Sequence, residues 1–436
     1  MKKLNVITKC RVCKNEDLTP IVNLGNQRLS GVFPGPNESQ PSKSPLELVR
    51  CNSTEDKSAC GLVQLRHFAN LEEMYGKTYG YVSSLSPTMA KHLKGIVKRT
   101  VDFAKPNSGD IVLDIGCNDG TMLNYYYGLE LKRIGIDPSS EKFISNFQDD
   151  IEVKYDFFTK SNIRELIGNR TIKIITSIAM FYDIEDPISF MRQIKSLLSE
   201  DGIWAIELSY FPLLLENLTY DQICHEHVTY LALKDINYMM SEVGLRVFDV
   251  DLNAVNGGSL FVIAGHKNAT YKSKINKIKK LLNKEKELSN EATYNRFKNR
   301  LMSHKEEVRQ FIGLIKKSGQ TIYGYGASTK GNIVLNFCDL TPDDLPAISD
   351  LNHEKIGLVT PGTGIPIISH DQIREIKPDY ILVLIWHFRR EVIDFELDYL
   401  KRGGKLFFHL PRLHIVDKHN YKRYLNASFK EQAFQL

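Results

Sequence analysis

The chain has 436 residues, and its 57 Lys and Arg residues against 52 Asp and Glu residues leave a formal net charge of only +5. This length predicts about two or three domains. The nearly balanced charge gives no reason to expect nucleic acid or an anionic membrane as a partner. The first nine residues are too polar for a signal peptide, and no apolar run approaches the ~20 residues that span a bilayer, so we expect a cytoplasmic protein.

The amino-terminal segment, residues 1–75, contains four of the seven cysteines. Two residues separate the first pair, as in a zinc knuckle, and eight mostly polar residues separate the second pair. Clustered cysteines in a reducing compartment favour a metal over disulfides, and a metal stabilises a segment with few core residues. Short strands are expected at 46–49 and 62–66. The predicted ligands of a structural zinc are Cys10, Cys13, Cys51 and Cys60.

Residues 76–266 have the pattern of a doubly wound α/β sheet. Apolar residues recur at helical spacing between 87 and 103. Segments with strand character then alternate with helical ones, which indicates a parallel sheet covered by helices. The last two strands, joined through Asn256-Gly257-Gly258, are typical of an antiparallel pair that closes such a sheet. The predicted strands are 111–116, 132–137, 152–158, 172–180, 202–208, 245–253 and 259–265.

The turn after the first of these strands is the most informative motif. It runs from Asp114 through Gly116 to Gly120, and the second strand ends at Asp137. The glycines let a ligand approach the backbone, and Asp137 is placed to accept hydrogen bonds from both hydroxyls of a ribose. Asn118 replaces the middle glycine of a dinucleotide fingerprint, and a carboxylate at Asp114 suits the ammonium of S-adenosylmethionine better than a pyrophosphate. The predicted cofactor contacts are Asp114, Gly116, Asn118, Asp119, Gly120, Asp137, Asp156, Phe157 and Met180.

Three consecutive polar residues, His225, Glu226 and His227, follow the fifth strand, where ligands of open α/β sheets bind. Histidine exchanges protons near neutral pH and a carboxylate orients or polarises it, so this triplet is a candidate for proton transfer. A metal site formed by the two histidines is an alternative. Cys224 just before them is interpreted as a small buried residue rather than as a nucleophile.

A second polar segment, Tyr79-Gly-Tyr81-Val-Ser-Ser84, lies between the cysteine-rich segment and the first helix of the sheet. The hydroxyls of Tyr79 and Tyr81 are candidates to donate hydrogen bonds to a substrate oxygen. Packing at a domain junction explains the two tyrosines equally well.

Residues 267–318 are strongly charged, with apolar residues at helical intervals, which predicts a linker of paired amphipathic helices between domains. Residues 319–436 then form a smaller α/β domain, whose first turn carries Ser328, Thr329 and Lys330. These groups are able to hold a phosphate at a helix start, although a structural corner with a solvated lysine fits the spacing as well. The later strands of this domain are predicted at 345–350, 379–386 and 404–410.

The order of the motifs along the chain is itself informative. They are Cys60-Gly-Leu-Val-Gln-Leu65, Tyr79-Gly-Tyr-Val-Ser-Ser84, Asp114-Ile-Gly-Cys-Asn-Asp-Gly120, Glu226-His227, Val255-Asn-Gly-Gly-Ser259, Gly324-Tyr-Gly-Ala-Ser-Thr-Lys330 and Pro361-Gly-Thr-Gly-Ile-Pro366. This order resembles the sugar C-methyltransferases that act on nucleotide-linked 4-keto deoxysugars, and the resemblance covers almost the whole chain. It implies a zinc domain, a class I methyltransferase domain and a Rossmann-like carboxyl-terminal domain that helps to bind the nucleotide sugar.

The resemblance also implies roles for particular residues. His227 matches the base of the family, and Glu226 is its carboxylate neighbour, expected to hold or polarise the imidazole. Two positions depart from the family pattern, because Cys224 replaces a tyrosine and Asp183 replaces a histidine. The residues expected to bind the sugar substrate are Tyr210, Asn256, Gly257, Gly258, Tyr325, Ser328 and Lys330.

The implied reaction is methylation at C-3 of a 4-keto hexose through an enolate, in branched-sugar biosynthesis, by a monomer or homodimer. Methyl transfer to a sugar oxygen or nitrogen is an alternative, since it requires one base and no ketone. A zinc-containing nucleic-acid binder or methyltransferase is a more distant one. It predicts basic residues interleaved with aromatic ones, a pattern that residues 1–75 lack.

Overall fold

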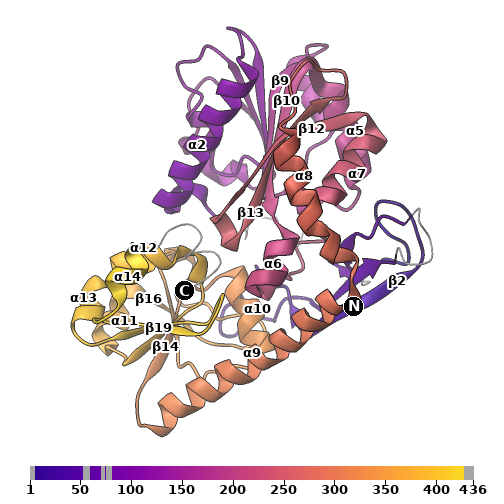
Figure 1. Ribbon diagram of the computed structural model, residues 1–436. Coiled ribbons are helices and arrows are strands. Elements are labelled where there is room, and N and C mark those ends of the chain that lie inside the picture. Colours follow the sequence, from indigo (N-terminus) through magenta and orange to yellow (C-terminus); the bar gives the residue numbers. More distant parts are fainter. Residues whose placement is uncertain (1–4, 53–58, 70–73, 75–80, 427–436) are drawn as a thin grey trace.

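The computed structural model describes residues 5–52, 59–69, 74 and 81–426. Within these ranges the strands form a central seven-stranded sheet, a six-stranded sheet, a four-stranded sheet and a two-stranded ribbon. Figure 1 shows the central sheet with its helices above the six-stranded sheet, and the small amino-terminal unit at one side. The predicted fold class, a doubly wound α/β domain with a small zinc-binding domain and a Rossmann-like carboxyl-terminal domain, is confirmed.

The central sheet has the order β12-β13-β10-β9-β6-β7-β8, which is 3-2-1-4-5-7-6 when its strands are numbered along the chain and read from β8. β13 runs antiparallel to both of its neighbours, and the other strands are parallel, so the predicted antiparallel closure is confirmed. Successive strands extend the sheet in one direction from β6 to β8 and in the opposite direction from β9 onward. Ligands of open α/β sheets bind at the point where this direction changes, here between β6 and β9. The strands are β6 (Ile111–Ile115), β7 (Lys132–Ile136), β8 (Ile151–Lys154), β9 (Ile172–Ile178), β10 (Leu198–Ser209), β12 (Leu245–Asn253) and β13 (Ser259–His266).

Helices cover both faces of the central sheet, which explains why β6 and β9 consist almost entirely of buried residues. On one face α2 (Pro87–Ala104) packs Leu93 and Ile96 against the sheet. Its start is fixed by Ser86, whose hydroxyl accepts a hydrogen bond from Met89 N. The opposite face is covered by α5 (Pro187–Leu197) and α7 (Leu233–Val243).

The carboxyl-terminal sheet has the order β16-β15-β14-β17-β18-β19, and only β19 is antiparallel to its neighbour. The predicted pair of amphipathic linker helices is confirmed as α8 (Ile275–Lys284) and α9 (Glu291–Lys317). Figure 1 shows α9 running from beside β2 to the lower end of β14. The strands and the first helix are β14 (Ile322–Tyr325), α10 (Thr329–Phe337), β15 (Ile348–Asp350), β16 (Ile367–Ser369), β17 (Tyr380–Val383), β18 (Lys405–Phe408) and β19 (His414–Val416).

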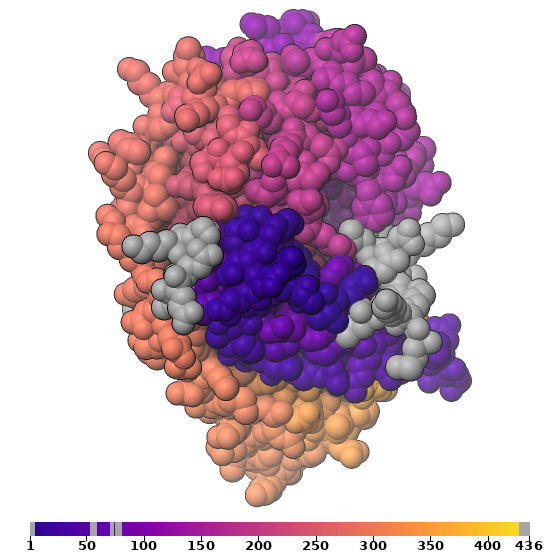
Figure 2. Space-filling model, turned by 90° about the vertical axis from the view of Figure 1, so that its right-hand side faces the viewer, coloured from indigo at the N-terminus to yellow at the C-terminus, as the bar shows by residue number. Residues whose placement is uncertain are grey.

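The amino-terminal unit is a sheet of order β11-β4-β3-β2. Its predicted strands appear as a longer β3 (Lys43–Cys51) and a shorter β4 (Val63–Leu65), whereas β2 (Leu18–Arg28) was not predicted because bulges interrupt its alternation. The edge strand β11 (Thr229–Tyr230) comes from the central part of the chain. Figure 2 shows this unit, in indigo, lying between the central unit above and the carboxyl-terminal unit below.

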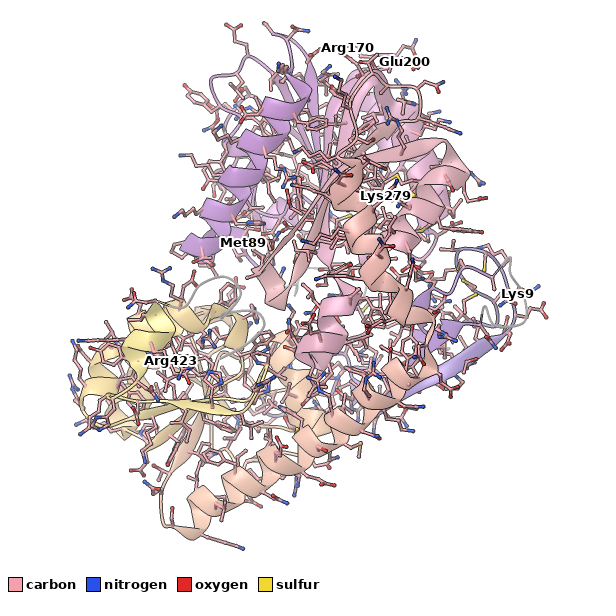
Figure 3. All side chains as sticks on the ribbon, viewed as in Figure 1. Lys9, Met89, Arg170, Glu200, Lys279 and Arg423 are labelled. Carbon is pink, nitrogen blue, oxygen red and sulfur yellow. The ribbon has the colours of Figure 1, made fainter. Side chains whose placement is uncertain are left out.

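The carboxyl ends of the central strands face the carboxyl-terminal unit. Figure 3 labels Arg170, just before β9, and Glu200, at the start of β10, at the far end of the sheet. Met89, at the start of α2, lies at the near end. The ligand-binding edge of the central sheet is therefore the edge closest to the second α/β unit. None of the helices in the described ranges combines the length and apolar composition needed to cross a bilayer.

Candidate active site

The four predicted zinc ligands come together in the amino-terminal unit. Their sulfur atoms all lie within 4.8 Å of one another, with Cys10 Sγ 3.6 Å from Cys60 Sγ and Cys13 Sγ 3.5 Å from Cys51 Sγ. Tetrahedral thiolate ligands about 2.3 Å from a zinc ion are separated by about 3.8 Å, so the cluster fits the metal. Asn15 Nδ2 donates to Cys51 Sγ at 3.5 Å, the kind of supporting contact that orients a ligand.

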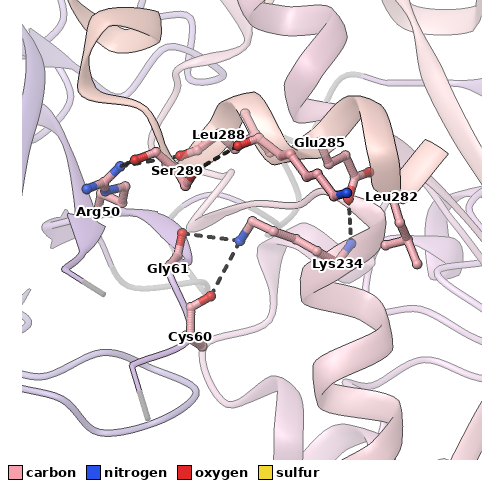
Figure 4. Close-up of a pocket in the computed structure, with 9 residues that line it drawn as sticks. Arg50, Cys60, Gly61, Lys234, Leu282, Glu285, Leu288 and Ser289 are labelled. Atoms are coloured by element: carbon pink, nitrogen blue, oxygen red, sulfur yellow. Dashed lines mark hydrogen bonds between the residues drawn. The ribbon is translucent and has the colours of Figure 1, made fainter. Parts of the chain in front are cut away.

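A cavity of about 320 Å³ lies beside this cluster, between β3, α7 and the segment after α8 (Figure 4). Its cationic groups bind backbone oxygens. Arg50 donates to the carbonyls of Leu288 and Ser289, and Lys234 Nζ donates to the carbonyls of Cys60 and Gly61. The carboxylate of Glu285 accepts hydrogen bonds from the backbone N–H groups of Leu233 and Lys234. These contacts join three segments of the chain, so we assign the cavity to a structural junction.

The glycine turn after β6 has the geometry expected for a close backbone approach. Gly116 has φ +77°, and a Cβ on it would lie 3.2 Å from Met180 Cγ. Gly120 also has φ +77°, and a Cβ there would lie 2.6 Å from the ring of Phe147. Side chains at these two positions would therefore strain the backbone and displace their neighbours. Met180, a predicted cofactor contact, lies directly against the turn.

Asp114 is a buried carboxylate in strand β6 of the central sheet, only 3% exposed. Its Oδ1 accepts a hydrogen bond from Thr176 Oγ1 at 2.6 Å. Burial raises the pKa of Asp114 to about 7, and the charge of Asp137 adds to this effect. A cation beside Asp114 would stabilise its charged form, so the residue fits the ammonium of S-adenosylmethionine.

Asn118 and Asp119 bind a neighbouring segment with their side chains. Asn118 Oδ1 accepts from Ser83 N at 3.0 Å, and its Nδ2 donates to Tyr81 O at 3.0 Å. Asp119 Oδ2 accepts from Ser84 N at 2.9 Å. The segment 81–84 is thus fixed across the glycine turn. The Tyr81 side chain is 43% exposed, and Tyr79 lies outside the described residues.

Asp137 ends β7 with its carboxylate at the same turn. Its Oδ2 accepts from Asn118 N at 3.0 Å, and its Oδ1 accepts from Ser139 N and Oγ at 2.6 Å. A carboxylate has about four acceptor positions, so one remains for a ribose hydroxyl. At the third strand, Asp156 accepts from Asn162 Nδ2 at 3.1 Å, and the Phe157 ring is partly exposed.

We expect Asp137→Ala to weaken S-adenosylmethionine binding by about 1.5–3 kcal/mol, the range for hydrogen bonds to a charged group. Isothermal titration calorimetry measures the change. The matched control is Asp149→Ala, since Asp149 is exposed in the turn before β8, at the other end of the sheet. An Asp137→Ala protein with wild-type melting temperature and wild-type affinity would remove Asp137 from the cofactor site.

His227 lies at the junction of the three units, and its hydrogen bond defines its tautomer. His227 Nδ1 is 2.8 Å from Gln222 O, and a carbonyl only accepts, so the proton is on Nδ1 and Nε2 carries the lone pair. The ring packs on Tyr182 with centroids 4.3 Å apart. Burial, together with the positive charge of Lys330, lowers the pKa of His227 to about 3. The side chain is therefore neutral at physiological pH, with Nε2 available as a base.

Glu226 and His225 point away from that imidazole. The oxygen Oε1 of Glu226 is close to Gly31, where a Cβ would lie 2.8 Å from it and 3.4 Å from Thr329 Oγ1. His225 is completely buried, and its Nε2 donates to Ser44 O at 3.2 Å. The expectation that Glu226 holds the imidazole is not met, because the backbone of Gln222 does so. Because the turn is irregular, the side chains of consecutive residues point toward different units of the protein.

Lys330 and Trp386 of the carboxyl-terminal unit contact Asn256 and the loop that contains His227. Lys330 Nζ is 3.5 Å from Asn256 O, an oxygen that also accepts from Gln222 Nε2 at 2.9 Å. Asp221 is completely buried, and its Oδ2 accepts from Trp386 Nε1 at 2.8 Å. Burial raises the pKa of Asp221, while the charge of Lys330 opposes that rise.

Two of the predicted substrate glycines have a packing role. A Cβ on Gly257, at φ +87°, would lie 2.7 Å from the Trp386 ring, and one on Gly258 would lie 2.8 Å from Leu213. The Tyr210 hydroxyl donates to Glu285 at 2.5 Å, and the Tyr325 ring packs edge-on against His370 within the carboxyl-terminal unit. These tyrosines therefore have structural partners. Sequence reasoning missed Asp221 and Trp386, although a carboxylate in an apolar loop and one of only two tryptophans were signals.

Strand order, glycine turn and thiol cluster together define a class I S-adenosylmethionine-dependent methyltransferase with a zinc domain. Three family models match in order: "Putative zinc binding domain" over residues 10–75, "Methyltransferase domain" over 89–250 and "C-methyltransferase C-terminal domain" over 254–411. C-methyltransferase NovU of Streptomyces niveus is 29% identical over 418 residues, 94% of this chain and 97% of that protein. These matches support an S-adenosylmethionine-dependent C-methyltransferase, as the motif order predicted.

Two further comparisons concern parts of the chain. The tRNA U34 carboxymethyltransferase of Campylobacter lari is 30% identical over 152 residues, which are 32% of this chain and 47% of that protein. A solved S-adenosylmethionine-dependent methyltransferase from Clostridium acetobutylicum is 13% identical with a TM-score of 0.32, over 41% of this chain and 92% of that one. The predicted cofactors, S-adenosylmethionine and a structural zinc, are confirmed by the family models and the thiol cluster.

Proposed function

We propose that this C-methyltransferase acts on a nucleotide-linked keto-sugar, at the carbon next to the ketone, which is C-3 of a 4-keto hexose. Carbon is a poor nucleophile until a base removes a proton made acidic by a neighbouring carbonyl. The observation that carries the proposal is the unprotonated Nε2 of His227 at the ligand-binding edge of the methyltransferase sheet. S-adenosylmethionine, when bound, supplies an electrophilic methyl group to the carbon that His227 has deprotonated.

The nucleotide part of the substrate is assigned to the carboxyl-terminal unit. Its parallel sheet begins with a glycine-rich turn at the end of β14, and α10 starts there with Ser328 as its cap. Such turns bring backbone N–H groups toward phosphates. The two α/β units meet at the loop that contains His227, so a nucleotide bound on one and a methyl donor bound on the other would share a reacting sugar.

Product analysis tests this proposal. We expect nucleotide-linked 4-keto-6-deoxyhexoses, incubated with enzyme and S-[methyl-¹³C]adenosylmethionine, to give a product whose labelled methyl carbon is bonded to carbon. Two-dimensional NMR identifies that bond from the couplings of the methyl protons to the sugar ring. A methyl group bonded to oxygen or nitrogen would instead establish the alternative transfer, which requires no ketone.

A further inference from the structure

Residues 218–228, between α6 (Phe211–Asn217) and β11, contain His227 and are called the catalytic loop here. One residue of this loop, Gln222, contacts both sides of the site. Its carbonyl accepts the Nδ1–H of His227 at 2.8 Å, and its amide donates to Asn256 O at 2.9 Å. The ammonium of Lys330 lies 3.5 Å from that same oxygen. Hydrogen bonds through Gln222 and Asn256 O therefore connect His227 to Lys330, although the two residues come from different units of the protein.

The start of α10 faces this loop along its whole first turn. Thr329 and Glu226 lie on either side of Gly31, since a Cβ on Gly31 would touch the side-chain oxygens of both. Lys330, the next residue of α10, lies close enough to His227 for its positive charge to lower the pKa of that imidazole. The hydroxyl of Ser328 accepts from Gly331 N at 3.0 Å and so caps the helix. Among Ser328, Thr329 and Lys330, only Lys330 carries a positive charge.

The titratable groups that face the Lys330 ammonium come from two segments. Asp221 and Cys224 belong to the catalytic loop with His227, and His387 follows β17. Trp386 already binds one carboxylate oxygen of Asp221. Burial lowers the pKa of Lys330, and the charge of Asp221 opposes this change. A buried ammonium beside a neutral imidazole is a donor suited to an oxygen that becomes negative during the reaction.

We infer that Lys330 is a catalytic residue that donates a hydrogen bond to the ketone oxygen of the substrate and stabilises the enolate formed there. The inference rests on the proposed function. His227 Nε2 takes the proton from the carbon, the C–H electron pair becomes the C=C bond, and the carbonyl π pair moves to the oxygen beside Lys330. The enolate carbon then attacks the methyl group, the ketone re-forms, the neutral thioether leaves and the imidazolium releases its proton to water.

The charges of Lys330 and His227 complement each other during the reaction. Before the reaction, burial and, to a smaller extent, the charge of Lys330 lower the pKa of His227 and keep the base unprotonated. When the proton moves, the single negative charge of the enolate would be attracted both to the ammonium of Lys330 and to the new imidazolium of His227. A phosphate bound by Lys330, as its position at the helix start suggests from sequence, would give it a role in affinity rather than in the proton-transfer step.

The test compares Lys330→Met and Lys330→Arg, with Lys316→Met as matched control. Lys316 lies in the last turn of α9, at the amino edge of the six-stranded sheet, and forms an ion pair with Asp344. Protein labelled with ¹⁵N-histidine, without substrate, is titrated by NMR. We expect the pKa of His227 to rise in Lys330→Met, while burial still holds it below its ordinary value of about 6.5. It should stay low in Lys330→Arg and in the control.

The second measurement follows exchange of the carbon-bound hydrogen of a nucleotide-linked 4-keto-6-deoxyhexose with deuterated water. Loss of a donor to a developing oxyanion predicts a fall of about 10²–10³-fold in the saturated rate for Lys330→Met. Partial retention in Lys330→Arg and a wild-type rate in Lys316→Met are expected.

Two results would overturn the inference while leaving the proposed function intact. One is an unchanged pKa of His227 in Lys330→Met. The other is carbon methylation at the wild-type saturated rate with a raised KM, which would assign Lys330 to phosphate binding. A wild-type product methylated on oxygen or nitrogen would instead remove the proposed function, and with it the enolate that Lys330 is inferred to stabilise.

Discussion

Replacing His227 by alanine is expected to reduce both hydrogen exchange and methylation by roughly 10²–10⁴-fold, the effect of removing a general base. Its Nε2 is the unprotonated atom at the ligand-binding edge, because Nδ1–H is bound to Gln222 O. Exchange is measured in deuterated water with a nucleotide-linked 4-keto-6-deoxyhexose and a non-reactive analogue of the methyl donor. Because the analogue cannot donate a methyl group, the experiment measures proton removal separately from methyl transfer.

The matched control is His225→Ala, two residues away. His225 is completely buried and binds the carbonyl of Ser44 in the amino-terminal unit. Its loss should therefore lower the stability of the protein and leave the exchange rate close to that of the wild type. Exchange at the wild-type rate in His227→Ala would show that another group is the base. Since the pKa of His227 is about 3, the wild-type exchange rate should not fall between pH 8 and pH 5 through protonation of this residue.

Replacing the zinc ligand Cys51 by serine is expected to release the metal and to abolish methylation while cofactor binding survives. β4 begins three residues after Cys60 and pairs with β11, whose first residue is only two positions after His227. Structural zinc sites contribute about 10–16 kcal/mol to the folding of small domains, so the sheet that holds the loop should be lost with the metal. The glycine turn after β6 belongs to another sheet.

Three measurements separate these effects. Elemental analysis should return about one zinc per wild-type chain and none for Cys51→Ser. Calorimetry should show S-adenosylmethionine binding to both proteins, and the methylation assay should detect product only from the wild type. Cys338→Ser, a buried cysteine of the carboxyl-terminal unit, controls for loss of a thiol and should keep its zinc. Full methylation by zinc-free enzyme would show that the metal is not needed to hold the catalytic loop in place.

The central sheet illustrates what local sequence patterns reveal. The strands around the turn from Asp114 to Gly120 were predicted within a few residues, because strands buried on both faces form short apolar runs and glycines mark their turns. The same logic missed β2, where bulges at two points break the alternation, and β11, which is only two residues long. A strand that short has no periodicity to detect.

The zinc ligands and the residues of the glycine turn were determined by the sequence alone, because spacing along the chain fixes both a knuckle and a βα turn. The arrangement around His227 was decided only by the tertiary structure. Trp386 and Asp221 are 165 positions apart, and Lys330 and Asn256 are 74 apart. Such pairs form because buried surfaces of three units pack together, and no local pattern records which polar groups then meet. The sequence therefore predicted the presence of a base, whereas only packing showed that Gln222 orients it and that Lys330 lies beside it.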